Sequence, residues 1–108
     1  MPPITKRGAA SHEDKRTARI PSLVADLASA DPVVRTKARE ALVAIGKLTV
    51  PSLIRLLSHR KPHVRWEAAK ALCGIANPFA ASALVNALDD RDGDVRWLAA
   101  GGGGRPRP

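Results

Sequence analysis

The hydrophobic positions of the chain follow a helical period. In residues 33–45, Val34, Ala38, Ala41, Leu42 and Ile45 stand at i, i+4, i+7, i+8 and i+11, with mostly polar residues between them. This spacing places the five side chains on one face of an α-helix, whereas a half-buried strand requires strict alternation. The pattern therefore predicts an amphipathic helix over residues 32–45.

The same pattern returns at a fixed distance along the chain. The dipeptide Val-Arg occurs at residues 34–35, 64–65 and 95–96, at steps of 30 and 31 residues. Each copy has a leucine seven residues before its valine and an alanine three residues after its arginine. A fixed period of this length is typical of solenoid proteins, in which each repeat is one supersecondary unit. We expect each unit to hold two helices, helix A with the Val-Arg pair and helix B with the leucines.

These patterns predict an all-α fold, an α-α superhelix of antiparallel helical hairpins with about two and a half repeats in residues 11–100. Asp31 before Pro32 has the chemistry of an N-cap followed by proline at the first helical position, and Gly46 predicts a helix end. Residues 1–10, a basic N-terminus, and residues 101–108, a Gly/Arg/Pro tail, are expected to be disordered. Helices are expected near residues 12–18, 20–29, 32–45, 50–58, 62–76, 79–89 and 94–100.

The repeat resembles the HEAT family, and specifically the short bacterial HEAT-like repeats of the phycobilin lyase type. The resemblance covers about residues 20–100, and it rests on the motifs Asp-Pro-Val-Val-Arg (31–35), Val-Pro-Ser-Leu (50–53), His-Val-Arg-Trp (63–66) and Asp-Val-Arg-Trp (94–97). It implies a scaffold without a cofactor that binds another protein of unknown identity. An accessory subunit of a bilin or tetrapyrrole lyase is an alternative that the family permits, although no residue requires it.

The resemblance also implies a structural role for the repeated arginines. In the family this arginine typically bonds to an aspartate of a neighbouring turn, and the resulting ladder holds the repeats in register. The ladder is expected to contain the arginines and the aspartates four residues ahead of two of them, with Lys61 replacing the aspartate in the middle repeat. Its expected members are Asp31, Arg35, Arg65, Asp92 and Arg96.

The B helices line the concave surface in this family, so their polar residues are the first candidates for contact with a partner. Ser52, Arg55, His59 and Asn86 are the expected contact residues, with Arg55 and His59 at i and i+4 as the favoured pair. Ordinary drift of a solvated surface would give the same variation between repeats.

Two tryptophans, Trp66 and Trp97, occupy one repeat position roughly opposite the core stripe of helix A. Exposed to solvent, they would form a hot spot for a partner protein. The alternative is that each indole lies along its neighbouring repeat. Both interpretations stay open at this point.

The net charge of +8 suggests an acidic partner, but residues 20–100 carry only +3 of it, from eleven basic and eight acidic side chains. Nucleic-acid binding without sequence preference is therefore a weaker alternative. It would use Arg55, Arg60, Lys61, Arg65 and the basic ends of the chain.

Catalytic and metal-binding motifs are missing from the sequence, so we expect neither an enzyme nor a cofactor. The acidic run at residues 89–94 lacks the glycine and terminal glutamate of a calcium loop. Cys73 is the only cysteine, which fits a reducing, cytoplasmic compartment, and no apolar run is long enough to span a bilayer.

The last repeat stops within helix A, where four glycines follow Ala100. Glycine costs about 1 kcal/mol per residue in a helix relative to alanine, so the helix should end near residue 101. An uncapped final repeat predicts self-association through this end, and it suggests a truncated piece of a longer repeat protein.

Overall fold

The computed structural model describes residues 12–101, and this part of the chain is helical without any strand, which confirms the all-α solenoid class. The expected disordered segments at residues 1–10 and 101–108 lie outside the described residues except for Gly101, which lies in a turn and donates its N–H to the carbonyl of Leu98. The elements are α1 (His12–Asp26), α2 (Pro32–Ile45), the 3₁₀-helix η1 (Gly46–Thr49), α3 (Val50–Leu56), α4 (Pro62–Ile75), α5 (Pro78–Ala87) and α6 (Gly93–Ala99).

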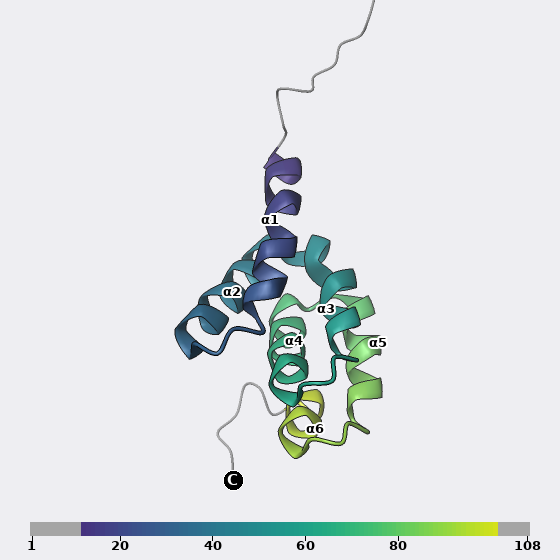
Figure 1. Ribbon diagram of the computed structural model, residues 1–108. Coiled ribbons are helices and arrows are strands. Elements are labelled where there is room, and N and C mark those ends of the chain that lie inside the picture. Colours follow the sequence, from purple (N-terminus) through teal and green to yellow (C-terminus); the bar gives the residue numbers. More distant parts are fainter. Residues whose placement is uncertain (1–11, 102–108) are drawn as a thin grey trace, which may run out of the picture.

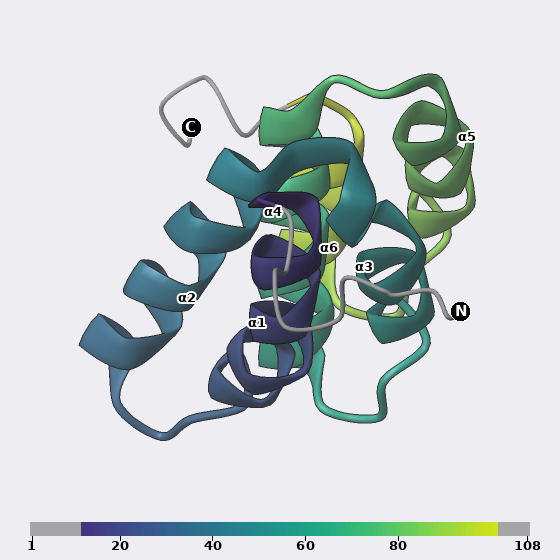
Figure 2. The same cartoon turned by 90° about the horizontal axis from the view of Figure 1, so that it is seen from above.

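The helices form pairs in which each B helix packs on the A helix that follows it: α1 on α2, α3 on α4, and α5 on α6. The A helices α2, α4 and α6 contact one another in sequence order and form one layer, the A layer. Helices α3 and α5 lie side by side against it and form the B layer (Figures 1 and 2). Helix α4 therefore occupies the centre, in contact with α2, α3, α5 and α6.

The core lies between the two layers. Leu27, Leu42, Leu53 and Leu72 are fully buried, and they come from the leucine positions that recur in the repeat. The central helix α4 adds buried alanines at 68, 69 and 71, whose small side chains let its neighbours approach closely.

The N-terminal helix differs from the sequence-based prediction. Residues 12–18 and 20–29 were expected to form two helices, but the structure has one helix, α1, with Pro21 inside it. Pro21 has no N–H for the carbonyl of Thr17, a loss that water can offset because Thr17 is exposed. Ile20 and Leu27 are both buried, so one apolar face continues across the proline and packing keeps the helix intact.

The connection between α2 and α3 was also not predicted. Gly46 ends α2 with a positive φ of 84°, and η1 carries the chain directly into α3. The buried Thr49 stabilises η1, because its Oγ1 donates to the carbonyl of Gly46 at 2.8 Å. The next repeat has Ala76 in place of the glycine, also at a positive φ, 56°.

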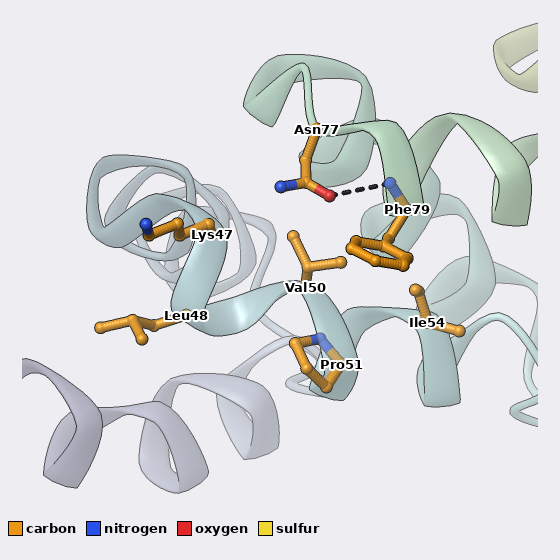
Figure 3. Close-up of a pocket in the computed structure, with 7 residues that line it drawn as sticks. All are labelled: Lys47, Leu48, Val50, Pro51, Ile54, Asn77 and Phe79. Carbon is orange, nitrogen blue, oxygen red and sulfur yellow. Dashed lines mark hydrogen bonds between the residues drawn. The ribbon is translucent and has the colours of Figure 1, made fainter.

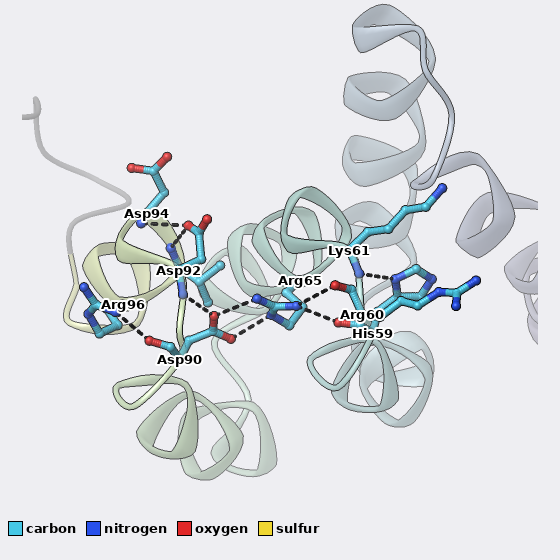
Figure 4. A network of polar contacts seen from close by, with 9 residues as sticks. His59, Arg60, Lys61, Arg65, Asp90, Asp92, Asp94 and Arg96 are labelled. Carbon is cyan, nitrogen blue, oxygen red and sulfur yellow. Dashed lines mark hydrogen bonds and ion pairs between the residues drawn. The ribbon is translucent and has the colours of Figure 1, made fainter.

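Every B–A turn is closed by the repeated arginine. The turns at residues 27–31, 57–61 and 88–92 have the same length, and in each the arginine donates to the carbonyl of the third turn residue. Arg35 reaches Ser29 O at 2.7 Å. Arg65 reaches His59 O at 2.8 Å, and Arg96 reaches Asp90 O at 2.7 Å (Figure 4). The guanidinium thus fixes the direction in which the chain leaves each B helix.

The same turn residue makes a second hydrogen bond with its side chain. Ser29 Oγ accepts from the N–H of Asp31 at 3.1 Å, His59 Nδ1 from that of Lys61 at 3.0 Å, and Asp90 Oδ1 from that of Asp92 at 2.8 Å. Three different residue types therefore act as the same acceptor. In each repeat, the residue directly after the one that donates this N–H is the first residue of helix A.

The turn role of His59 can be tested by substitution. His59→Ala removes the acceptor for the N–H of Lys61, and the free energy of unfolding should fall by about 1 kcal/mol. His59→Asn keeps a short acceptor, as the Ser29 and Asp90 turns do, and should retain most of that stability. Urea unfolding followed by circular dichroism measures both variants. Equal losses would show that packing of the ring, and not Nδ1, stabilises the turn.

Candidate binding groove

A hollow of the described surface lies where η1 and the first turns of α3 and α5 meet. It has a volume of about 650 Å³. Its lining residues, drawn in Figure 3, are Lys47, Leu48, Val50, Pro51, Ile54, Asn77 and Phe79. The floor is apolar, and the hollow is open to solvent.

A second hollow of about 280 Å³ continues between α3 and α5 toward their C-terminal ends. It is lined by Ile54, Leu57, Ser58, Ala83, Asn86, Ala87 and Asp90. Because Ile54 lines both hollows, we treat them as one surface, and we call the two sets of lining residues together the α3/α5 groove.

Phe79 is the most exposed large apolar residue of the described part, with 74% of its surface accessible. Its position follows from the start of α5: Asn77 caps the helix by accepting from the N–H of Phe79 at 2.9 Å, and Pro78 occupies the first helical turn. The ring lies beside Val50 and Ile54, with Lys47 across the hollow (Figure 3). Phe79, Lys47 and Ile54 were not predicted as contact residues, and for Phe79 the reason is that a single exposed aromatic residue leaves no periodic signal.

The contact residues expected from the sequence are only partly brought together. Asn86 is exposed and lines the groove. Ser52 and Arg55 lie on α3 but bond to each other, with Arg55 Nη2 donating to Ser52 Oγ at 3.2 Å. His59 lies in the turn after α3, where its ring nitrogen and carbonyl are both used. The expected pair Arg55 and His59 is therefore divided between a helix face and a structural turn.

Trp66 and Trp97 lie on the A helices α4 and α6, away from the α3/α5 groove. Trp66 is half-buried, and the guanidinium of Arg39 on α2 lies 5.6 Å from the centre of its ring. This geometry is a cation–π contact between neighbouring repeats. For Trp66 the structure therefore favours the interpretation that the indole lies along its neighbour.

The A layer contains a separate polar hollow of about 360 Å³ around Trp66. Its centre is Glu67, which is 5% exposed and accepts from Arg39 at 2.6 Å. Arg35 lies 3.4 Å from the other oxygen of Glu67. The charges of this hollow thus bind α2 to α4, and Glu67 is a structural residue that the sequence analysis did not identify.

The expected arginine–aspartate ladder has a different set of partners in the structure. Asp31 and Asp92 are N-caps: Asp31 Oδ1 accepts from the N–H of Val33 at 2.9 Å, and Asp92 Oδ1 from that of Asp94 at 2.9 Å. Among the repeated arginines, Arg35 pairs with Glu67, as described above. Arg65 pairs with Asp90, which accepts two bonds from it, at 2.9 and 3.1 Å. This pair joins the second helix pair to the turn of the third (Figure 4).

Asp90 connects α4, its own turn and α6 through its hydrogen bonds. Burial by itself would raise the pKa of its carboxyl, but the hydrogen bonds from Arg65 and from the N–H of Asp92, with the nearby charge of Arg91, lower it below the usual 3.8. Asp90 is therefore held as a carboxylate. Its carbonyl also accepts from Arg96.

The described residues contain neither a candidate metal site nor a thiol with a lowered pKa. Among residues 12–101, no three or more His, Cys, Asp or Glu side chains are grouped so that they could hold a metal ion. Cys73 is exposed, which differs from a core position, and its Sγ lies 3.7 Å from the carbonyl of Leu98. Partial burial raises the pKa of this thiol although Lys70 acts in the opposite direction, so the thiol stays protonated near neutral pH.

A family model for HEAT repeats matches residues 20–102. This match covers most of the chain, which therefore belongs to the HEAT-repeat family. Resemblance to the phycobilin lyase subgroup stays a prediction, because the match extends to the family only. A comparison with curated proteins gives no significant match. Within the described part, no helix combines the length and the apolar composition that crossing a bilayer requires.

The Arg65–Asp90 pair generates a prediction for stability. Asp90→Asn leaves the buried guanidinium of Arg65 without its counter-charge, and the free energy of unfolding should fall by about 3 kcal/mol. Asp89→Asn, at the exposed neighbouring position, should change it by less than about 0.5 kcal/mol. Chemical unfolding at neutral pH compares the two variants.

The sign of the pH dependence follows from the lowered pKa of Asp90. Its contribution to stability is present above the usual value of 3.8 and is lost as the pH falls through the lower pKa of the folded state. The difference in stability between the original chain and Asp90→Asn should therefore shrink between about pH 5 and about pH 2. A difference that stays constant over this range would contradict the assigned ion pair.

Proposed function

We propose that this HEAT-repeat chain is a protein-binding scaffold that holds its partner in the α3/α5 groove. The observation that carries the proposal is the apolar hollow beside Phe79, on a face where α3 and α5 are held by the layer beneath them. HEAT repeats generally form non-catalytic scaffolds for protein interaction, and a non-enzymatic role without a cofactor is part of the proposal.

The energetics of the groove support a protein partner. Large apolar side chains that are exposed beside a hollow are typical of interaction sites, because covering them removes apolar surface from water. Phe79 is suited to this role, since aromatic anchors commonly provide a large share of the binding energy. Asn86 adds a polar group at the other end of the groove, where it can orient a partner.

The nucleic-acid alternative loses one of its expected residues. Arg65 is 5% exposed and uses its guanidinium for Asp90 and for the carbonyls of His59 and Arg60. It is therefore not presented to a phosphate backbone. Arg55, Arg60 and Lys61 are exposed, with Arg55 on α3 and the other two in the turn that follows it, so they stay available to this alternative.

Two further expectations from the sequence stay predictions. Self-association through the last helix pair would use Val85 of α5 and Leu88 in the turn after it, which are 63% and 43% exposed. The cytoplasmic location rests on the use of cysteine and on the lack of a bilayer-spanning apolar run in the sequence. Both are independent of the α3/α5 groove.

A pull-down with matched variants tests the groove. The tagged full chain should retain a protein partner from a nuclease-treated bacterial lysate, and Phe79→Ser should weaken the affinity by about 30-fold, the effect of losing about 2 kcal/mol of contact energy. Val85→Ser is the control, because Val85 is an exposed apolar residue of the same helix outside the groove. Quantitative mass spectrometry measures the partner retained by each bait.

Equal retention by the chain and by Phe79→Ser would contradict the proposal. Loss of the partner only with Val85→Ser would move the contact to the open face of α5. Retention that disappears on nuclease treatment would favour the nucleic-acid alternative.

A further inference from the structure

The chemistry of the α3/α5 groove restricts what can bind there. Of the residues that line the larger hollow, only Lys47 and Asn77 are polar, and the Asn77 oxygen is already used by the N–H of Phe79. The volume of about 650 Å³ leaves room for a large apolar side chain. A ligand must therefore bring a large apolar side chain into this hollow.

The charge of the groove indicates which kind of residue should lie next to that apolar side chain in the ligand. The segments η1, α3 and α5 carry two charged residues, Lys47 and Arg55, both basic and both exposed. The one carboxylate among the lining residues, Asp90, lies at the opposite end and is neutralised by Arg65. The charged lining residue at the η1 end of the groove is therefore Lys47, and a carboxylate next to the apolar group of a ligand could pair with it.

The dimensions of the groove favour a short segment. At about 1.5 Å per residue, the helices α3 and α5 are about 10 and about 15 Å long. An extended peptide covers about 3.3 Å per residue, so about three to five residues span the groove. A small amphipathic acid fits less well, because the hollow is open and would leave much of such a ligand in water.

We propose that the α3/α5 groove binds a short acidic peptide segment of a partner protein, with a large apolar side chain in the hollow beside Phe79 and an adjacent carboxylate at the ammonium of Lys47. This inference rests on the proposed function, since it names the chemistry of the partner at the same site. It also gives the orientation of the bound peptide, whose acidic residue lies at the η1 end of the groove.

Selection from a library of random displayed peptides, with the full chain as bait, tests this inference. The chain should enrich sequences that place Asp or Glu next to Phe, Leu, Ile or Trp. Lys47→Glu should enrich the same apolar residues with Lys or Arg beside them, because the charge at the edge of the hollow is reversed. Phe79→Ser should enrich no such motif.

Lys37→Glu is the matched control. Lys37 is exposed on α2, does not line the groove, and its substitution changes the net charge by the same amount. It should leave the enriched motif unchanged. A synthetic peptide of the enriched sequence should then bind about tenfold more weakly to Lys47→Glu than to Lys37→Glu by fluorescence anisotropy. Circular dichroism establishes that all variants fold.

Three results would overturn the inference: no enriched motif with the original chain, an acidic motif that survives Lys47→Glu, or an equal loss with Lys37→Glu, which would indicate attraction by net charge alone. Any of these, together with a lysate partner that is still lost with Phe79→Ser, would leave the proposed function in place with a different partner chemistry. If Phe79→Ser also retains the partner, the proposed function fails as well.

Discussion

The arginine that closes each B–A turn is the interaction on which the rest of the structure depends. Its guanidinium donates to a turn carbonyl that the preceding helix leaves unused, and the bond fixes how each B helix packs on the next A helix. Arg65 does more than the other two, because its bidentate bond to Asp90 joins the second pair to the third. This bond holds the end of α5 beside α4, and the position of α5 next to α3 defines the α3/α5 groove.

The two layers therefore differ in the charged interactions that their side chains make. The A layer contains the inter-repeat charges, with Arg35 and Arg39 on Glu67 and the Trp66 ring beneath Arg39. Breaking a buried pair of this kind is costly, so these residues are constrained by stability. The B layer contributes Asp90 to the pair with Arg65, at the far end of the α3/α5 groove from Phe79. An interaction surface on that layer can change without loss of the fold.

Much of the fold could be predicted because periodic patterns report on packing. The stripe from Val34 to Ile45 gave α2 with the bounds that the structure shows, and the Val-Arg register located every closing arginine. The division of α1 into two helices was wrong, because buried Ile20 and Leu27 outweigh the cost of Pro21. Local propensity alone does not contain that balance.

The candidate site was harder to predict, because it depends on contacts between residues far apart in the sequence. His59 and Asn86 look alike as polar residues near the ends of B helices, yet one closes a turn and the other lines the groove. The 30-residue and 31-residue steps that relate Ser29, His59 and Asp90 were visible in the sequence, but their shared role as acceptors is hidden by three different side chains. Glu67 and Phe79 have no repeated counterpart to reveal them.

Mapping the partner onto the chain by NMR tests the central claim most directly. The ¹⁵N-labelled chain, titrated with the partner retained in the pull-down, should show its largest amide shifts in residues 47–55 and 77–87, around the α3/α5 groove. The amides of α2 and the Trp66 face of α4 should change little. Shifts concentrated on α2, α4 and α6, with the groove unaffected, would contradict the account and place the binding surface on the A layer.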